Sequence, residues 1–166
     1  PLDPKNPPRV ISFLDVFNRR LDPYRDVLAR SSAVVEYLRG AMELPGKDRI
    51  QDLQYFFRYL ENSDPDIARD AFLEFAKASD AEVGQVANKL SADKLRGWLQ
   101  DPQTPGNRLS LYAFMLGACG TPADAGVLRD LLQKPTERTL GPLGGILVGF
   151  IQLQPEEGWK KAHTML

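Results

Sequence analysis

Two stretches of the sequence share one order of turn residues, charged residues and apolar residues. They are LENSDPDIARDAFLEFAKA and LQDPQTPGNRLSLYAFMLGA. Aligning Pro65 with Pro105 superposes them at a spacing of 40 residues, and aligning Arg69 with Arg108 fits nearly as well at 39. A third copy, LQKPTERTLGPLGGILVGFI, is shorter and less regular. Repeats of this length are typical of arrays in which each repeat is one supersecondary unit that buries its apolar face against its neighbours.

Helix-start residues precede the apolar stripes from residue 31 onward. A Ser, Thr or Asp side chain at the start of a helix accepts a hydrogen bond from a backbone N–H that would otherwise be unpaired. The predicted caps are Ser31 or Ser32, Asp48 with Gln51, Asp64 before Pro65, Ser79 with Glu82, Ser91, Thr104 before Pro105, and Thr121 with Asp124. With a helix near residues 142–153 and another beginning in QPEEGWKKAHTML, the pattern predicts about eight helices.

The apolar stripes of these helices are expected to form one continuous core. A chain of 166 residues is long enough to bury about 70% of the surface that its unfolded state exposes. Aromatic residues at helical spacing beside apolar neighbours are expected in the core or at its edge, namely Trp98, Trp159, Tyr55 and Tyr59. The predicted core consists of Phe57, Phe72, Phe75, Leu111, Tyr112, Met115, Leu131 and Phe150.

The sequence from about residue 48 to 155 resembles the HEAT-repeat family. The first copy carries the family's pattern Asp-Pro-x-hydrophobic-Arg-x-x-Ala, and the matching residues are Asp64, Pro65, Ile67, Arg69 and Ala71. The resemblance implies an all-α fold, an α-α superhelix in which a HEAT-like helical repeat domain occupies residues 31–166.

The second copy departs from the family pattern at its turn. It keeps Arg108, but Thr104 stands in place of the turn aspartate that the family's Asp–Arg ladder between repeats requires. The tetratricopeptide pattern fits less well, because neither Trp98 nor Trp159 is followed by Leu-Gly at the required offset.

The first 30 residues differ in composition from the rest. PLDPKNPP has four prolines in eight residues, which favours an extended linker. Residues 10–17, VISFLDVF, fit either a short strand or a helix face; their β-forming residues favour a strand, and NRRLDP then predicts a turn. We therefore expect residues 1–30 to form a linker or extended segment, or the tail of an upstream domain. This segment is expected to contain one strand that has no partner strand.

A second resemblance concerns this N-terminal part. FLDVFNRRLDPYRDV followed by VVEYLRGA is similar to a junction in uncharacterised bacterial proteins, where a β-rich domain leads into a HEAT-like array. That resemblance implies no activity. An unpaired strand edge can pair with a second copy, so we expect a monomer or a weak dimer.

Three aspartates, Asp64, Asp66 and Asp70, have the spacing of a calcium loop. An EF-hand loop beginning at Asp64 would need glycine at its sixth position and glutamate at its twelfth, where this chain has Arg69 and Phe75. We therefore interpret these aspartates as helix-capping and helix-dipole residues.

The remaining residues of catalytic type are few. Cys119 is the single cysteine and His163 the single histidine, which is too few for a zinc site. Cys119 is expected to be a small buried residue, and Gly144–Gly145 is expected to allow close helix packing rather than phosphate binding. The sequence thus predicts no catalytic, cofactor-binding or metal-ligating residue and no cofactor.

Charge argues against nucleic acid as a partner. The chain has 21 Lys and Arg against 22 Asp and Glu, and adjacent cations occur only as pairs such as Arg19–Arg20 and Lys160–Lys161. Nucleic-acid binding depends on neutralising phosphates. No apolar run approaches the roughly 20 residues of a membrane-spanning helix, so no membrane span is expected.

These observations favour a non-catalytic protein-interaction or scaffold module that binds another protein or an upstream domain of the same chain. Two alternatives remain open. One is an accessory enzyme resembling the HEAT-like chromophore lyases, and the other is structural support for an upstream catalytic domain. HEAT-like enzymes that excise alkylated DNA bases would need a basic face, which the near-zero net charge disfavours. The sequence indicates no cellular compartment.

Overall fold

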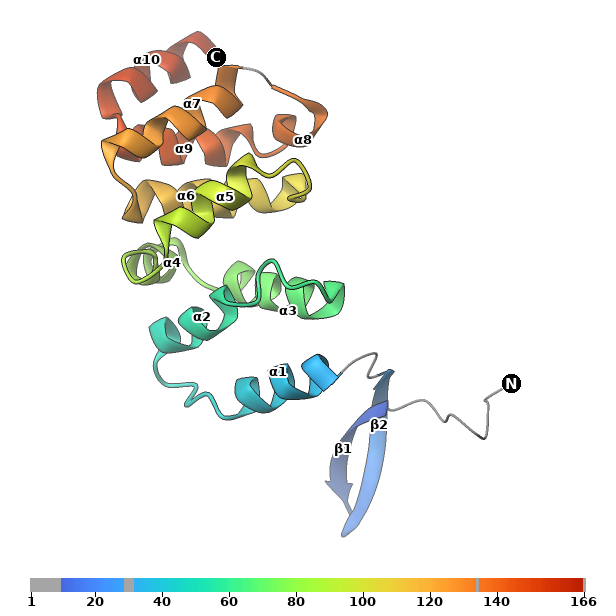
Figure 1. Ribbon diagram of the computed structural model, residues 1–166. Coiled ribbons are helices and arrows are strands. Elements are labelled where there is room, and N and C mark those ends of the chain that lie inside the picture. Colours follow the sequence, from blue (N-terminus) through green and yellow to red (C-terminus); the bar gives the residue numbers. More distant parts are fainter. Residues whose placement is uncertain (1–9, 29–31, 134, 166) are drawn as a thin grey trace. The chain divides into compact units, whose positions relative to one another are not determined.

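The computed structural model describes residues 10–28, 32–133 and 135–165. The protein is 67% helical, with ten α-helices and one short antiparallel sheet of two strands in that described part (Figure 1). The prediction of a mostly helical chain with a β segment at its N-terminus is confirmed. The predictions for residues 1–8 and for a cap at Ser31 lie outside the described residues.

Two compact units make up the chain, Pro1–Pro45 and Gly46–Leu166. The sequence predicts a boundary between residues 30 and 31, so this division lies one helix later along the chain. That residues 31–166 form a single repeat domain stays a prediction.

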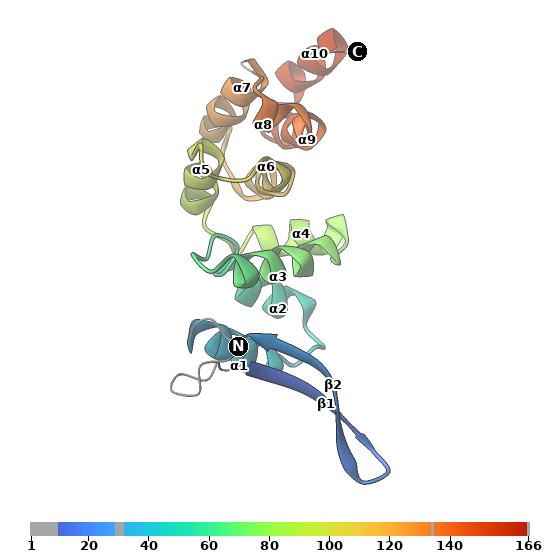
Figure 2. The ribbon, with the colours of Figure 1, turned by 90° about the vertical axis from the view of Figure 1, so that its right-hand side faces the viewer.

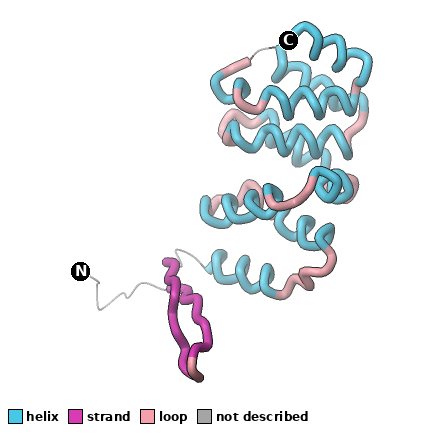
Figure 3. Tube along the Cα trace, turned by 180° about the vertical axis from the view of Figure 1, so that it is seen from behind, coloured by secondary structure: helices cyan, strands magenta, loops and turns pink. Residues whose placement is uncertain are grey.

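The first unit contains a β-hairpin, drawn in magenta in Figure 3. Strand β1 (Val10–Phe17) matches the predicted strand, but it pairs with β2 (Arg20–Leu28), so the expectation of a strand without a partner was wrong. The loop between the strands is Asn18–Arg19, and both residues have positive φ, +50° and +61°. Two positive φ angles are typical of the type I′ turn, which joins strands of right-handed twist.

The sequence did not predict strand β2, because it contains a proline and proline is rare in central strands. Pro23 lies opposite Leu14, next to an irregularity in the register between Phe13 and Leu14. Each strand of a two-stranded sheet is an edge strand, where a missing backbone N–H costs little. Helix α1 (Ser32–Met42) completes the unit and ends before Pro45, as predicted.

The second unit consists of nine α-helices in its described residues. They are α2 (Arg49–Phe57), α3 (Pro65–Ala76), α4 (Asp80–Ala87), α5 (Ala92–Gln100), α6 (Leu109–Cys119), α7 (Ala125–Gln133), α8 (Glu137–Leu140), α9 (Leu143–Leu153) and α10 (Pro155–Met165). Helix α2 contacts α3 and α4, and α4 contacts α6. Beyond α4, helices α5 and α7 form one layer and α6 and α9 a second, as Figure 2 shows. Helix α10 packs on α9.

Most of the predicted caps are present. The side chains of Asp48, Asp64, Ser79 and Ser91 each accept a hydrogen bond from a backbone N–H in the first turn of α2, α3, α4 and α5. The prediction for Thr104 was wrong. Helix α6 begins instead through a 3₁₀ turn, Gly106–Arg108, which has no side-chain cap.

Helices α6 and α9 approach each other closely because glycines line their interface. A Cβ atom added to Gly149 would lie 2.2 Å from the carbonyl oxygen of Ala113, and one added to Gly145 would lie 2.5 Å from the Cβ of Ser110. Gly144 has no such neighbour within 4 Å. The expectation of close packing at Gly144–Gly145 is therefore confirmed for Gly145 alone.

Five of the eight predicted core residues are buried, namely Phe57, Phe75, Tyr112, Met115 and Phe150. The other three, Phe72, Leu111 and Leu131, are only half-buried, because they lie at the margins of the apolar stripes of their helices. Trp98 packs between two of the buried rings, whereas Trp159 is 59% exposed, so its predicted core position was wrong.

Two arginines donate hydrogen bonds to backbone carbonyls at or just beyond the ends of earlier helices. Arg108, which precedes α6, donates a hydrogen bond to the backbone carbonyl of Leu60, after α2. Arg138, in α8, donates to the carbonyl of Leu99 at 3.4 Å. Arg138 also donates to the carbonyls of Asp101 at 2.6 Å and Thr104 at 3.1 Å. Arg108 and Arg138 are 30 residues apart, a spacing that differs from the 39 or 40 of the sequence copies, so the repeat stays a prediction.

Candidate binding groove

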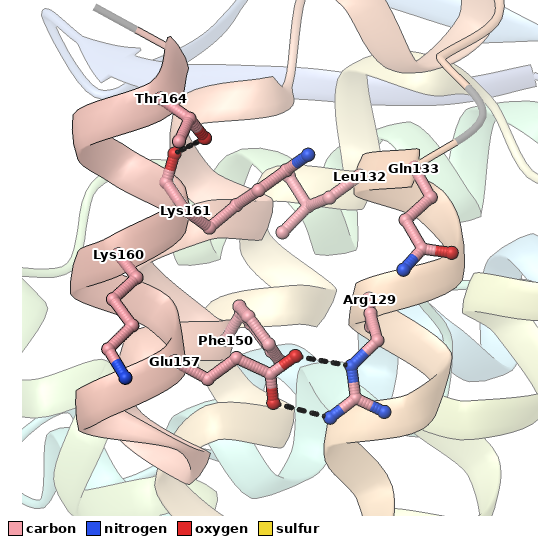
Figure 4. A pocket seen from close by; sticks show the side chains of 8 residues that line it. All are labelled: Arg129, Leu132, Gln133, Phe150, Glu157, Lys160, Lys161 and Thr164. Atoms are coloured by element: carbon pink, nitrogen blue, oxygen red, sulfur yellow. Dashed lines mark hydrogen bonds and ion pairs between the residues drawn. The ribbon is translucent and has the colours of Figure 1, made fainter.

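A groove lies between α7 and α10, with α9 at its floor (Figure 4). It encloses about 240 Å³. Its lining residues are Arg129, Leu132, Gln133, Phe150, Glu157, Lys160, Lys161 and Thr164. We call it the α7–α10 groove.

One ion pair crosses this groove from α7 to α10. The Nε and Nη2 of Arg129 donate hydrogen bonds to the two carboxylate oxygens of Glu157, at 2.8 and 2.7 Å (Figure 4). The Arg129 guanidinium also lies 5.6 Å from the centre of the Phe150 ring. The Arg129 hydrogen bond lowers the pKa of Glu157 and the same contact raises the pKa of Arg129, so both groups are charged at neutral pH.

The rest of the lining combines apolar and cationic side chains. Leu132 and Phe150 close the bottom of the groove as an apolar floor, and both are almost fully buried, at 4% and 1% exposed. Lys160 and Lys161 add two cations from α10, and in Figure 4 the Lys161 ammonium extends across the groove toward α7. The lining thus has three cations, including Arg129, and one anion.

A second groove crosses the exposed edges of α6 and α9 and reaches the end of α3 and the start of α4. It encloses about 360 Å³, and most of its lining residues are apolar. Its lining residues are Phe75, Ala76, Ala78, Asp80, Val83, Ser110, Leu111, Phe114, Gly145 and Val148. We call it the α6–α9 groove. Val148 is 44% exposed there.

A polar cluster beneath α6 has a structural role. The hydroxyl of Tyr112 donates a hydrogen bond to a carboxylate oxygen of Glu61 at 2.5 Å, and Arg108 donates to the same oxygen at 2.9 Å. Burial and the Glu61 carboxylate raise the pKa of Tyr112 far above its ordinary value. The tyrosine therefore remains protonated and holds α6 to the end of α2.

Two of the three aspartates singled out in the sequence make contacts at the start of α3. Asp64 caps α3 by accepting a hydrogen bond from the Asp66 N–H, and the Asp66 carboxylate lies 3.3 Å from a guanidinium nitrogen of Arg69. Asp70 is exposed on the same helix. The residues that the structure describes contain no group of three or more His, Cys, Asp or Glu that could hold a metal ion. The capping interpretation of Asp64 is confirmed, while the absence of a cation site stays a prediction.

Cys119 lies half-buried at the end of α6. Burial, with a smaller effect of the Asp124 carboxylate, raises its pKa above the ordinary value, so the thiol is protonated at neutral pH. A protonated thiol is a much weaker nucleophile than a thiolate. His163 is exposed on α10. These properties favour a structural role for Cys119.

Sequence reasoning missed the α7–α10 groove. Lys160–Lys161 is visible in the sequence as a basic pair, and acidic residues such as Glu156 and Glu157 are common at helix starts, where they complement the helix dipole. Both glutamates do lie in the first turn of α10. The ion pair of Glu157 joins residues 28 positions apart, however, and no local spacing indicates it.

Comparisons of the chain with protein-family models, with curated proteins and with solved structures find no match. None of the helices within the described residues has both the length and the apolar character needed to span a membrane.

Proposed function

We propose that the helical unit Gly46–Leu166 is a HEAT-like array of helix pairs that binds segments of other proteins and has no catalytic role. Two features support the array. Helices α5 and α7 lie in one layer and α6 and α9 in another, and Arg108 and Arg138 each donate hydrogen bonds to a backbone carbonyl at or beyond the end of an earlier helix. Arrays of this kind present extended surfaces to partners.

The observation that carries the proposal is the α6–α9 groove. Its lining comes from four helices, α3, α4, α6 and α9, so that the surface extends along the array. Apolar side chains such as Leu111, Phe114 and Val148 line it, and Val148 is 44% exposed. Apolar surface left open to water beside a groove is typical of sites that bind protein segments.

Selection of displayed random peptides on the immobilised full chain tests this proposal. We expect selected peptides to lose most of their affinity for Val148→Glu, because a carboxylate in the α6–α9 groove would be desolvated on binding. Leu73→Glu is the matched control, since Leu73 is equally exposed, at 47%, but lies outside the groove lining. Equal binding by both variants, or no selected binder at all, would refute the proposal.

The hairpin supports a second candidate function, structural support for another domain. Val16, Phe17, Leu21 and Tyr24 are each more than half exposed. A two-stranded hairpin is marginally stable in water by itself, and its open edges are templates for pairing. We infer that β1 or β2 joins a sheet contributed by further protein. Sedimentation should then show concentration-dependent association of the chain that Phe17→Thr with Leu21→Thr reduces; a chain that stays monomeric throughout would count against this candidate.

A further inference from the structure

The α7–α10 groove and the α6–α9 groove differ in charge. Arg129, Lys160 and Lys161 line the α7–α10 groove against one carboxylate, that of Glu157. The whole chain, by contrast, has a net charge of −1. The cations lie around an apolar floor of Leu132 and Phe150. A surface with this arrangement is complementary to an apolar side chain flanked by carboxylates.

We propose that the α7–α10 groove binds an acidic segment of a partner protein, with one apolar side chain on Leu132 and Phe150 and carboxylates beside Lys160, Lys161 and Arg129. This inference rests on the proposed function, because it assumes that the helical unit binds protein segments. It adds a second site and a chemical class of partner.

Glu157 occupies part of this site in the unbound protein. Its carboxylate forms both hydrogen bonds with Arg129 that an incoming carboxylate would form. Arg129 and Glu157 have side-chain exposures of 37% and 50%. Ion pairs this exposed contribute little to stability, because water screens them. A partner carboxylate can therefore replace Glu157 at small cost, and removing the Glu157 charge should strengthen binding.

The size of the groove favours a peptide side chain over a small-molecule substrate. Its volume of about 240 Å³ is below the ~300–1,000 Å³ of typical small-molecule pockets. Nucleic acid fits less well, because carboxylates repel phosphates. The Glu157 carboxylate lies among the three cations, and Glu156 adds a second carboxylate in the first turn of α10. Phosphate neutralisation over several nucleotides needs a longer run of cations.

The test uses a fluorescein-labelled peptide of glutamate and serine around one central leucine, titrated into the full chain and followed by anisotropy. Lys160→Glu with Lys161→Glu should weaken binding roughly tenfold or more. Glu157→Gln should strengthen it roughly two- to fivefold, the equivalent of a surface ion pair. Lys89→Glu with Lys94→Glu is the matched control, since both lysines are exposed outside the groove, and it should change binding little. Circular dichroism melting verifies that each variant is folded.

Several results would overturn the inference. Equal weakening by both lysine double variants would indicate attraction by net charge alone. Unchanged affinity for a peptide with serine in place of the central leucine would show that the apolar floor has no role. Weaker or unchanged binding to Glu157→Gln would exclude the competition. Failure of the acidic peptide to bind, while selected peptides still bind the α6–α9 groove, would reject this site and leave the proposed function standing; failure of both would reject both.

Discussion

Gly149 lies in α9 where that helix comes closest to α6. A Cβ there would lie 2.2 Å from the Ala113 carbonyl oxygen and 2.7 Å from the carbonyl carbon, both backbone atoms. Gly144, in the same helix, has open space around it. We predict that Gly149→Ala lowers the free energy of unfolding by about 1–3 kcal/mol. Gly144→Ala should raise it by up to about 1 kcal/mol, because alanine is the better helix former.

Urea unfolding followed by circular dichroism measures both variants. The two substitutions are chemically identical and lie five residues apart in one helix, so propensity cancels in their difference. Similar unfolding free energies for Gly149→Ala and Gly144→Ala would contradict the close approach of α6 and α9.

Arg19 has a left-handed backbone conformation, with φ at +61°. For residues other than glycine this conformation costs roughly 1–2 kcal/mol. Asn18–Arg19 occupies a type I′ turn, for which Asn-Gly is the preferred pair. Arg19→Gly should therefore stabilise the hairpin by about 1 kcal/mol, visible as slower hydrogen exchange of amides in β1 and β2. Unchanged or faster exchange would show that the turn differs from the one described.

Residues that act within one helical turn were the most predictable from the sequence. The caps at Asp48, Asp64, Ser79 and Ser91 need only the backbone of the next few residues, and all four are present. Glu157 could not be assigned in the same way. Its partner, Arg129, lies on a different helix, so its role depends on how α7 and α10 pack.

A buried carboxylate links α5 to the turn before α7. Asp124 accepts hydrogen bonds from the Thr121 N–H and from the guanidinium of Arg96 in α5. Burial alone would raise the pKa of Asp124, but these contacts outweigh it and lower the pKa below the ordinary value of 3.8. Ionised Asp124 therefore stabilises the folded state above that pH, and the contribution is lost as the pH falls through the folded-state pKa.

We predict that Asp124→Asn lowers the unfolding free energy at pH 7 by about 1–3 kcal/mol, since the hydrogen bonds to a charged group weaken. The difference from the unsubstituted chain should shrink as the pH falls below 3.8. Urea unfolding at a series of pH values measures it. A difference that is constant with pH would mean that the charge of Asp124 contributes no stability.

Helix α3 shows where an apolar stripe misleads. Phe72 and Phe75 were both predicted in the core, but Phe75 is 2% exposed while Phe72 is half-buried, with the Arg108 guanidinium 5.9 Å from its ring centre. Phe75→Ala should cost about 3–5 kcal/mol of unfolding free energy, and Phe72→Ala distinctly less. Equal losses in thermal or urea unfolding would place Phe72 in the core after all.

At the scale of the whole chain, the sequence predicted the mostly helical content but not which helices are neighbours. The first two sequence copies align α3 with α6, but they do not indicate that α6 packs mainly on α9, with α5 and α4 as further neighbours. The β-hairpin was half predicted, because Pro23 concealed its second strand. Which helices and strands pack together depends on contacts between residues far apart in the chain. Turn residues and apolar periodicity indicate only local structure, so they do not predict these contacts.

Binding of a protein segment in the α6–α9 groove can be located residue by residue. The most direct measurement is a map of backbone amide chemical-shift changes in the ¹⁵N-labelled full chain on adding a peptide selected on that chain. We predict changes concentrated in α4, α6 and α9, around Leu111, Phe114 and Val148. Changes confined to α2 and α5, or spread evenly over all helices, would contradict it.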